Sequence, residues 1–597
     1  MSGKTVRLGG ASAFWGDSSL GAPQLVHGAE IDYLVFDYLA ELTMSIMAAA
    51  RARRPDAGYA TDFVAITMKQ LVRDIKAKGI KVVSNAGGVN PLACRDALQR
   101  VAEEAGVSLK VGVVLGDDLM ARQAEFRAAG THEMYSDAAF PDKLMSINAY
   151  LGARGIAAAL AEGCEVVITG RVVDSAVTLG PLMHEFGWAD DDFDRLAAGT
   201  LCGHIIECGA QCTGGLFTDW ERVASWENIG YPVAEVSADG SFVIGKPRGT
   251  DGLVCFGSVA EQLLYEIQDP SAYLVPDVAC DFTAVQMREM GENRVLVSGA
   301  RGRPPTSTYK VSATYQDGLR NVATLVIGGI DADRKARRTG QTILARTRRM
   351  FQQRNLADYS ETRLEVLGSE DMYGSNSRLA GPREVVLRIA VKHPEKEALE
   401  IFAREFAPAG TSMAPGTTGL GGRPSPTPIV RLFSFLVEKA DVPVELDIEG
   451  NRRPVAIRTA GGFPGSASAE VRAVAALPPE GATVNLPLVR LAYGRSGDKG
   501  DTANIGIIAR QPECLPLLRW WLTPERVKAY FAHLCRGPVE RFDLPGLGAM
   551  NFLLHRSLGG GGMASLHSDN LAKAYAQMLL DLEVPVPKAV AQRLVAA

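Results

Sequence analysis

An arginine and an aspartate follow a buried-strand pattern in the stretch Gly163–Gly187. The β-branched run Val166–Ile168 predicts a strand buried on both faces of a parallel sheet. Arg171 ends the polar turn Thr169–Arg171 that follows, and Asp174 occupies the expected N-cap of a helix predicted to continue to His184 and end near Gly187. Ligands of α/β proteins bind where strands end and helices begin, so both side chains are predicted to face a site. The alternative is that they only pair with each other and cap the helix.

Four earlier segments repeat this unit of an apolar strand, a polar turn and a helical stretch. The predicted strands are Thr5–Leu8, Ile31–Phe36, Lys81–Ser84 and Leu109–Leu115. Alternation of β and α elements predicts an α/β fold whose parallel sheet has helices on both faces, with a barrel-like arrangement as the alternative.

Polar residues cluster after each of the five strands. Right-handed crossovers would bring all five carboxyl ends to one edge of the sheet and form a cleft there, although polar loops alone would give the same pattern. Glu41, Asp117 and Asp174 are candidate acids or bases, and Arg171 joins them as a candidate catalytic residue. The candidate substrate-binding residues at this edge are Asp17, Asp37, Asn85, Gly87, Gly88 and Asn90, the two glycines through their backbone N–H groups.

The stretch 199–220 is dense in glycine and cysteine. In a continuous helix His204, Cys208 and Cys212 would share one face, but the spacing matches no standard zinc pattern, and we predict no metal site. Asp37, Asp117, Asp118 and Asp174 could bind Mg²⁺ only if they met, which the sequence does not fix. We interpret this stretch as a substrate-facing loop in which Glu207 acts as acid or base; the alternative is a buried structural role for each residue.

Later segments change to α+β patterning from about residue 230. We predict a hairpin over Val233–Lys246, and then strands, helices and a long loop. The strands are Tyr309–Tyr315, Val322–Ile327 and Glu384–Val391, the helices Ala332–Arg354 and Pro394–Phe406, and the loop Ala407–Pro428. The predicted domains are a large one over 1–459, a linker over 460–484 and a small one over 485–597.

The small domain is predicted to be a ferredoxin-like α+β sandwich. Its predicted elements are strands Leu486–Tyr493, Asn504–Ala509, Val539–Phe542 and Ala549–Leu554, and helices Thr523–Cys535 and Asp569–Leu582. Two glycine-containing turns carry Arg495 with Lys499, and His555 with Arg556. They could bind an anion of the substrate, or could be tight turns with surface charge.

Composition narrows the classes of protein. The chain has 597 residues, 47% of them hydrophobic and 22% charged, with a net charge of -5, so we expect no nucleic-acid partner. Nine cysteines without a regular framework suggest free thiols in the cytoplasm, and no segment predicts a membrane span. There is no G-x-G-x-x-G, and the nearest P-loop spacing, Gly240–Lys246, is followed by Pro247, so a nicotinamide or nucleotide cofactor is not indicated.

Several motifs together resemble one family. They are FDYLAELTMS, NAGGVNP, VITGRVVDSA, ECGAQCTGG and GRSGDKGDTANIG, and the chain is similar to the acyclic terpene utilisation (AtuA-like) family in its long form, with a C-terminal ferredoxin-fold domain. The resemblance implies citronellol and geraniol catabolism, in which branched acyclic terpenoid acids are processed as coenzyme A thioesters. It supplies no set of catalytic residues.

Two hypotheses follow. The first is an enzyme with hydratase or lyase chemistry on a small-molecule acyl-CoA or related acid, using no cofactor beyond the coenzyme A of the substrate. The second is a non-catalytic scaffold or binding protein for pathway enzymes. In either case we expect a homo-oligomer.

Overall fold

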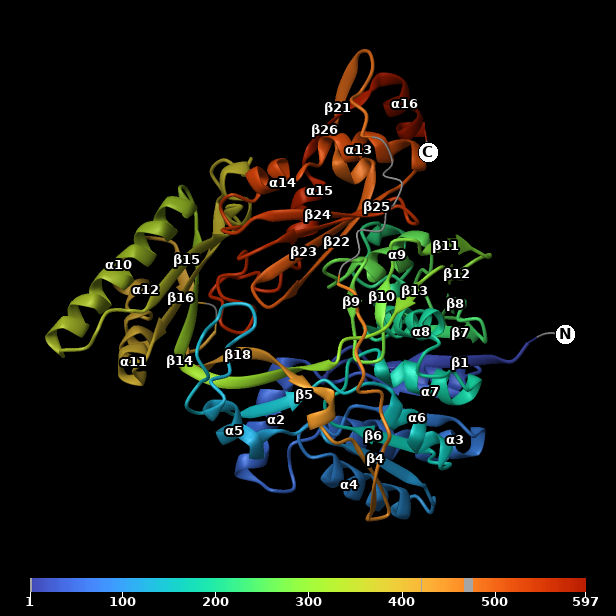
Figure 1. Ribbon diagram of the computed structural model, residues 1–597. Coiled ribbons are helices and arrows are strands. Elements are labelled where there is room, and N and C mark those ends of the chain that lie inside the picture. Colours follow the sequence, from blue (N-terminus) through green and yellow to red (C-terminus); the bar gives the residue numbers. More distant parts are fainter. Residues whose placement is uncertain (1–2, 420, 466–475, 597) are drawn as a thin grey trace.

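A large open sheet forms the base of the molecule in the computed structural model, which describes residues 3–419, 421–465 and 476–596 (Figure 1). Its five central strands are parallel, and each is one of the five predicted from the sequence. In spatial order they are β1 (Thr5–Gly10), β2 (Tyr33–Phe36), β3 (Lys81–Ser84), β6 (Val166–Thr169) and β4 (Val111–Leu115). All five carboxyl ends therefore lie on one edge, as predicted.

Antiparallel strands extend this sheet on both sides. Beyond β1 lie β7 (Val233–Ser237), β8 (Phe242–Gly245), β12 (Val295–Ser298) and β11 (Gln286–Glu289); beyond β4 lie β19 (Glu445–Ile448) and β20 (Asn451–Pro454). The β7–β8 pair is the hairpin predicted from its Asp-Gly turn. The sheet has two free ends, so the barrel alternative was wrong.

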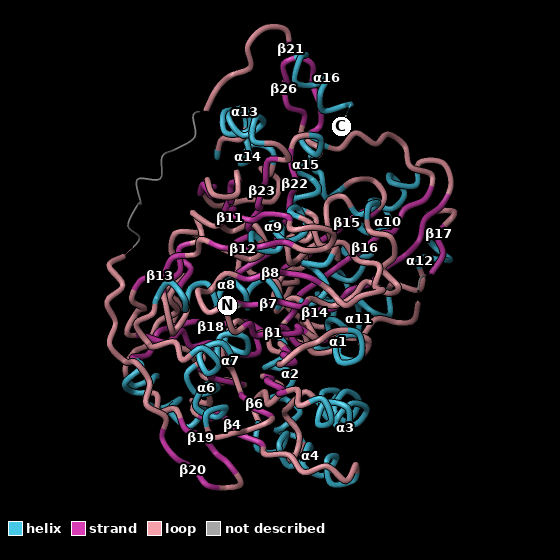
Figure 2. Tube along the Cα trace, turned by 90° about the vertical axis from the view of Figure 1, so that its right-hand side faces the viewer, coloured by secondary structure: helices cyan, strands magenta, loops and turns pink. Residues whose placement is uncertain are grey.

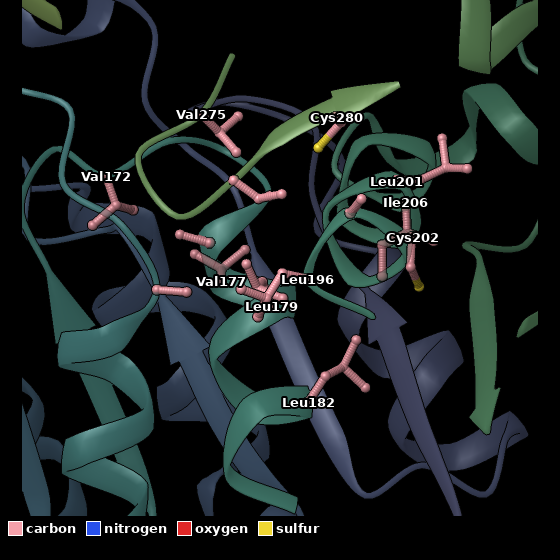
Figure 3. Packing of buried hydrophobic residues seen from close by; sticks show 14 of the residues in the cluster. Val172, Val177, Leu179, Leu182, Leu196, Leu201, Cys202, Ile206, Val275 and Cys280 are labelled. Atoms are coloured by element: carbon pink, nitrogen blue, oxygen red, sulfur yellow. The ribbon is translucent and has the colours of Figure 1, made fainter. Parts of the chain in front are cut away.

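Helices cover both faces of the parallel strands. One face carries α1 (Gly21–Gly28), α3 (Lys69–Lys78) and α4 (Pro91–Glu104), and the other α6 (Arg154–Ala161), α7 (Ala176–Phe186) and α8 (Phe193–Ile206). Val82 packs into the first core and Val83 into the second, because side chains alternate along a strand. Figure 3 shows Leu179 of α7 lying beside Leu196 of α8 in the second core.

A second sheet is organised around one long strand, β14 (Thr308–Gly328). Its first half pairs with β5 (Ser146–Ala149) and β18 (Thr427–Glu438), and its second half with β16 (Glu384–His393) and β17 (Thr417–Gly419); β15 (Glu361–Leu367) then pairs with β16. Two strands, Tyr309–Tyr315 and Val322–Ile327, had been predicted where β14 runs through. Instead the register with β18 shifts between Gln316 and Leu319, and the strand continues.

Helices α10 (Ala332–Gln353) and α11 (Lys396–Glu405) pack on the second half of this sheet and bury its apolar face. Both were predicted. The predicted loop Ala407–Pro428 is wrong in part, since it contains α12 (Ala409–Ser412) and β17, which adds to the edge of β14.

The C-terminal domain is a four-stranded antiparallel sheet covered by helices. Its order is β22 (Ala492–Lys499), β23 (Thr502–Ala509), β25 (Ala549–Leu554) and β24 (Val539–Leu544), with α13 (Leu515–Trp521), α14 (Pro524–Tyr530) and α15 (Tyr575–Leu580). A separate pair joins β21 (Thr483–Pro487) to β26 (Glu583–Pro587), and α16 (Lys588–Ala596) follows.

Three local predictions in this domain were wrong. The predicted charged turn Arg495–Asp501 is mostly strand, because β22 continues through Lys499 before the chain turns at Gly500 and Asp501. The predicted strand 486–493 is interrupted by a 3-10 turn at Leu488–Arg490, and the predicted last helix shortens to α15. In the described part of 455–482, between β20 and β21, there is no regular element.

The helix α9 (Phe256–Leu264) joins the two domains. It lies against β22 and β23 in both views of the molecule (Figures 1 and 2). A Cβ atom added to Gly506 would lie 2.5 Å from Cβ of Leu264, and one added to Gly497 would lie 2.7 Å from the ring of Tyr265. The glycines of the GRSGDKGDTANIG motif thus allow the C-terminal sheet to approach α9 closely.

Candidate functional site

Arg171 is anchored directly after β6, at the point predicted from the sequence. Its guanidinium donates to the Leu39 carbonyl and to Asp174 Oδ1, both at 2.7 Å, and lies 4.2 Å from the ring centre of Tyr150. The side chain is almost fully buried. Helix α7 has Ser175 as its N-cap, so Asp174 pairs with Arg171 and is not the N-cap that we predicted.

Asp117 binds the backbone of Arg171. Its Oδ2 accepts hydrogen bonds from the Arg171 backbone N–H at 2.8 Å and from Asn148 Nδ2 at 2.9 Å. Burial raises the pKa of Asp117 to about 7, although both hydrogen bonds act to lower it. The neighbouring Asp118 pairs instead with Arg51, at 3.3 Å. Asp117 therefore positions the loop that carries Arg171.

Asp37 and Asn85 form a buried pair beside Arg171. Asn85 donates to Asp37 at 2.5 Å and accepts from the Tyr38 backbone N–H at 2.8 Å. Burial, reinforced by Asp174 and Glu207, raises the pKa of Asp37 well above its usual range. The Asn85 amide is committed to these contacts and holds Asp37 in place.

Glu41 begins α2 (Glu41–Arg53) and accepts a 2.5 Å hydrogen bond from the hydroxyl of Tyr150. Burial acts to raise the pKa of Glu41, but Arg171, Lys310 and Lys499 outweigh it and lower the value to about 2. Glu41 is therefore an ionised partner of these cations at neutral pH, which suits it to charge balance more than to proton transfer.

Glu207 and His204 form a dyad at the end of α8. His204 Nδ1 lies 3.4 Å from Glu207 Oε1, and His204 Nε2 lies 3.0 Å from the Leu263 carbonyl, which can only accept a hydrogen bond. Nε2 must therefore carry a proton, whereas Nδ1, although only 3.4 Å from Glu207 Oε1, has no hydrogen-bond partner among the described residues. Burial raises the pKa of Glu207, although His204 acts to lower it. Burial acts to lower the pKa of His204, but Glu207 outweighs it and raises the value. Among the described residues, Glu207 Oε2 has no hydrogen-bond partner.

The C-terminal domain adds its own charges to the same place. Lys499, at the end of β22, pairs with Glu266 at 2.6 Å, and Lys573 lies 3.6 Å from Glu266 and bonds the hydroxyl of Tyr265. Burial acts to lower the pKa of Lys499. The carboxylates of Glu266, Glu41 and Asp174 outweigh this effect, and the pKa is raised. Burial and Glu266 raise the pKa of Asp498 to about 7.

We call this assembly the interdomain cluster. Its members are Glu41, Arg171, Asp174, Glu207, Glu266, Lys310, Lys499 and Lys573. Solvent reaches it, because the side chain of Asp174 is 30% exposed and that of Lys499 is 47% exposed, whereas Arg171 and Glu207 are 5% and 10% exposed. Buried groups of the large domain thus lie in the same cluster as partly exposed charges from both domains.

The remaining predicted residues lie outside the cluster. Asp17 accepts from the Tyr231 hydroxyl and from two loop amides, and Asn90 donates to the carbonyls of Pro55 and Ala57. Gly88 adopts a φ of +54° and its N–H bonds the Asn85 carbonyl, so it has no free donor. A Cβ on Gly87 would lie 2.4 Å from the Thr169 carbonyl, so this glycine allows two strand-end loops to approach each other.

The two glycine turns of the C-terminal domain do not form one anion site. Arg495 stacks 4.6 Å from the ring centre of Tyr265 and donates to Gln211, whereas His555 pairs with Glu540 at 2.6 Å. The backbone N–H groups of Leu558 and Gly560 both donate to Asp501, at 3.0 Å. A carboxylate of the protein itself occupies the second turn, and Arg556 bonds the Arg536 carbonyl.

Sequence reasoning missed five members or neighbours of the cluster, namely Tyr150, Tyr265, Glu266, Lys310 and Lys573. Tyr150 directly follows β5, and Lys310 lies in β14, with which β5 pairs. The neighbours of both residues along the chain are apolar, and no motif surrounds them. Glu266 has an unusual φ of +58° directly after α9, a feature that only the structure reveals.

Other features of the described residues were considered as candidate sites. A small pocket lined by Leu151, Asp277, Tyr309, Ile457 and others does not contain the acid–base dyad. Within the described residues no group of three or more His, Cys, Asp or Glu side chains is arranged to hold a metal. Helix α8 ends at Ile206, so His204, Cys208 and Cys212 do not share the helix face considered above. No helix in the described part of the chain is long and apolar enough to cross a membrane.

The fold and the site define a class of two-domain α/β proteins in which a ferredoxin-like domain completes a charged cluster at the carboxyl edge of a parallel sheet. The chain belongs to the acyclic terpene utilisation family, because the family described as "Acyclic terpene utilisation family protein AtuA" matches residues 6–448. The "AtuA ferredoxin-like domain" matches residues 486–585. No protein of curated function and no solved structure matches the chain. Membership gives the protein a role in acyclic terpene utilisation.

Proposed function

We propose that the protein is an enzyme of acyclic terpenoid or branched-acid catabolism with hydratase- or lyase-type chemistry on an acyl-CoA or a related acid. The observation that carries the proposal is the His204–Glu207 dyad, in which the buried Glu207 Oε2 has no hydrogen-bond partner among the described residues and the carboxyl group interacts electrostatically with Asp174 and Lys499. Such chemistry needs a group that moves a proton next to a carbonyl and cations that stabilise the resulting oxyanion.

In the proposed mechanism Glu207 Oε2 removes the proton next to the substrate carbonyl or returns it. Burial keeps the pKa of Glu207 above its usual range, which makes it a stronger base than a solvated glutamate. His204, fixed through Nε2 by the Leu263 carbonyl, shares the proton through Nδ1. Arg171 and Lys499 would stabilise negative charge on the carbonyl oxygen. These steps need no cofactor apart from the coenzyme A carried by the substrate.

The test begins with isothermal titration of the full chain with coenzyme A and with geranyl-CoA, and continues with mass spectrometry of the incubated thioester. We expect Glu207→Gln to bind the thioester and to lose at least about a hundredfold in turnover, the usual contribution of a general acid or base.

Glu261→Gln is the matched control. Glu261 is also a buried glutamate whose pKa burial raises, to about 8, but it accepts from the Thr218 backbone N–H outside the cluster. Equal activity losses in both variants would refute a specific role for Glu207. If no thioester binds, the acyl-CoA proposal is wrong, and a non-catalytic scaffold for pathway enzymes becomes the better hypothesis. Analytical ultracentrifugation would test the expected homo-oligomer.

A further inference from the structure

Lys310 differs from the other cations of the interdomain cluster in its lack of a partner. Arg171 bonds Asp174, Lys499 bonds Glu266, and Lys573 bonds Tyr265. Across the described residues, the Lys310 ammonium has neither a hydrogen-bond acceptor within bonding distance nor a carboxylate within 4 Å. An ammonium without a partner beside acid–base groups is available to an anion from solution.

Two tyrosines enclose this ammonium. Lys310 Nζ lies 5.5 Å from the ring centre of Tyr150 and 5.9 Å from that of Tyr135. The position of Lys310 is fixed because β14 pairs with β5, and the Tyr150 backbone N–H donates to the Lys310 carbonyl at 3.0 Å. The ammonium is therefore oriented by the protein before any ligand arrives, which reduces the entropy that binding must overcome.

Tyr135 comes from a separate, self-supported loop. Its backbone N–H and that of Ser136 donate to Glu133 Oε2, at 2.8 and 2.6 Å, and the Met134 N–H donates to the Ser434 carbonyl of β18 at 2.8 Å. The Tyr135 side chain is mostly exposed. The aromatic ring thus borders the space in front of Lys310 and remains open to solvent.

The neighbouring charges favour a single negative charge on the ligand. Glu41 is ionised, and it acts on Lys310 without contacting it. An ionised carboxylate this close would repel a doubly charged phosphate more strongly than a singly charged carboxylate.

From this geometry we infer that Lys310, between Tyr135 and Tyr150, binds a free carboxylate of the substrate, separate from the carbonyl at which the reaction occurs. The inference rests on the proposed function and narrows its substrate class to acyl thioesters that carry a second, ionised carboxyl group. It assigns substrate recognition to β14, whereas the dyad on α8 carries the proton.

The test compares two thioesters of the same branched skeleton by isothermal titration. 3-Methylglutaryl-CoA carries a free carboxylate and isovaleryl-CoA does not. We expect the wild-type chain to bind the first about tenfold or more tightly than the second, as a charge-assisted hydrogen bond supplies. Lys310→Met should abolish this preference and leave the affinity for isovaleryl-CoA unchanged.

Lys396→Met is the control, because it removes the same charge from an exposed residue paired only with Glu400; it should retain the preference. Lys310→Arg should retain most of it, which guards against a folding defect in the Met variant. Equal affinity of the wild type for both thioesters, or an undiminished preference in Lys310→Met, would refute the carboxylate subsite and leave the proposed function intact. Failure of both thioesters to bind would refute the proposed function and this inference with it.

Discussion

Replacement of Asp117 by asparagine is expected to stabilise the protein, although this residue lies at the site. The Asp117 carboxyl is nearly fully buried and both of its hydrogen bonds end on one oxygen, Oδ2. The Asn oxygen can accept the same two bonds, from Asn148 and the Arg171 backbone, without a buried negative charge. Asp117→Asn therefore removes the cost of that charge and keeps the contacts.

The magnitude follows from the pKa. In the unfolded chain Asp117 ionises near its ordinary value of 3.8, and in the folded chain at about 7. The raised value means that the folded state holds its proton more tightly, so the stability due to Asp117 is present below pH 4 and is lost as the pH rises to about 7. The full difference corresponds to about 4 kcal/mol. We expect Asp117→Asn to gain about 2–4 kcal/mol over the wild type at pH 8 and nothing at pH 4.

Urea unfolding followed by circular dichroism at pH 4, 6 and 8 measures this difference. If both domains unfold together, the gain corresponds to about 2–3 °C in Tm at pH 8 for a chain of 597 residues. Asp117→Ala, which removes both acceptors, should instead be destabilised at every pH. A gain of equal size at pH 4 and pH 8 would show that the buried charge is not its cause, and a loss at pH 8 would refute the reasoning.

Two further predictions concern the domain interface and Glu41. Gly506→Ala places a methyl group against Leu264, and we expect it to cost about 1–3 kcal/mol in urea unfolding and to weaken thioester binding. Gly500→Ala, at a φ of +62° with open space around it, should cost about 1 kcal/mol and leave binding unchanged; equal effects would refute the close-approach argument. Tyr150→Phe removes the hydroxyl that donates to Glu41 and should raise the pKa of Glu41 above about 2, seen by ¹³C NMR titration of the carboxyl. An unchanged titration would contradict the assigned hydrogen bond.

The parallel sheet was predictable from the sequence because each of its strands is short, β-branched and followed by a polar turn. Buried strands of this kind have a strong local signal, and Arg171 was found because it follows one of them. Glu207 was predicted from composition alone, since glycines around it obscured the helix that places it. The sequence did not indicate that α8 ends at Ile206; the structure shows it.

The other half of the cluster lacked such a signal. Lys310 lies within a strand of ordinary composition, and only pairing between β14 and β5 brings it to Tyr150. Lys499 was predicted as a turn residue of an anion site; its true partner, Glu266, is more than two hundred residues away along the chain. Contacts of this kind depend on how the domains dock, which local patterns do not encode.

The glycine-lined contact between α9 and the C-terminal sheet also has a consequence during synthesis. Arg171 and the His204–Glu207 dyad are synthesised long before Lys499 and Lys573. Until β22 and β23 have emerged and settled on α9, Glu266 has no cationic partner and the cluster is incomplete. A nascent chain therefore carries Arg171, His204 and Glu207 without Lys499 and Lys573, and the charge balance of the cluster is reached only after the last domain has folded.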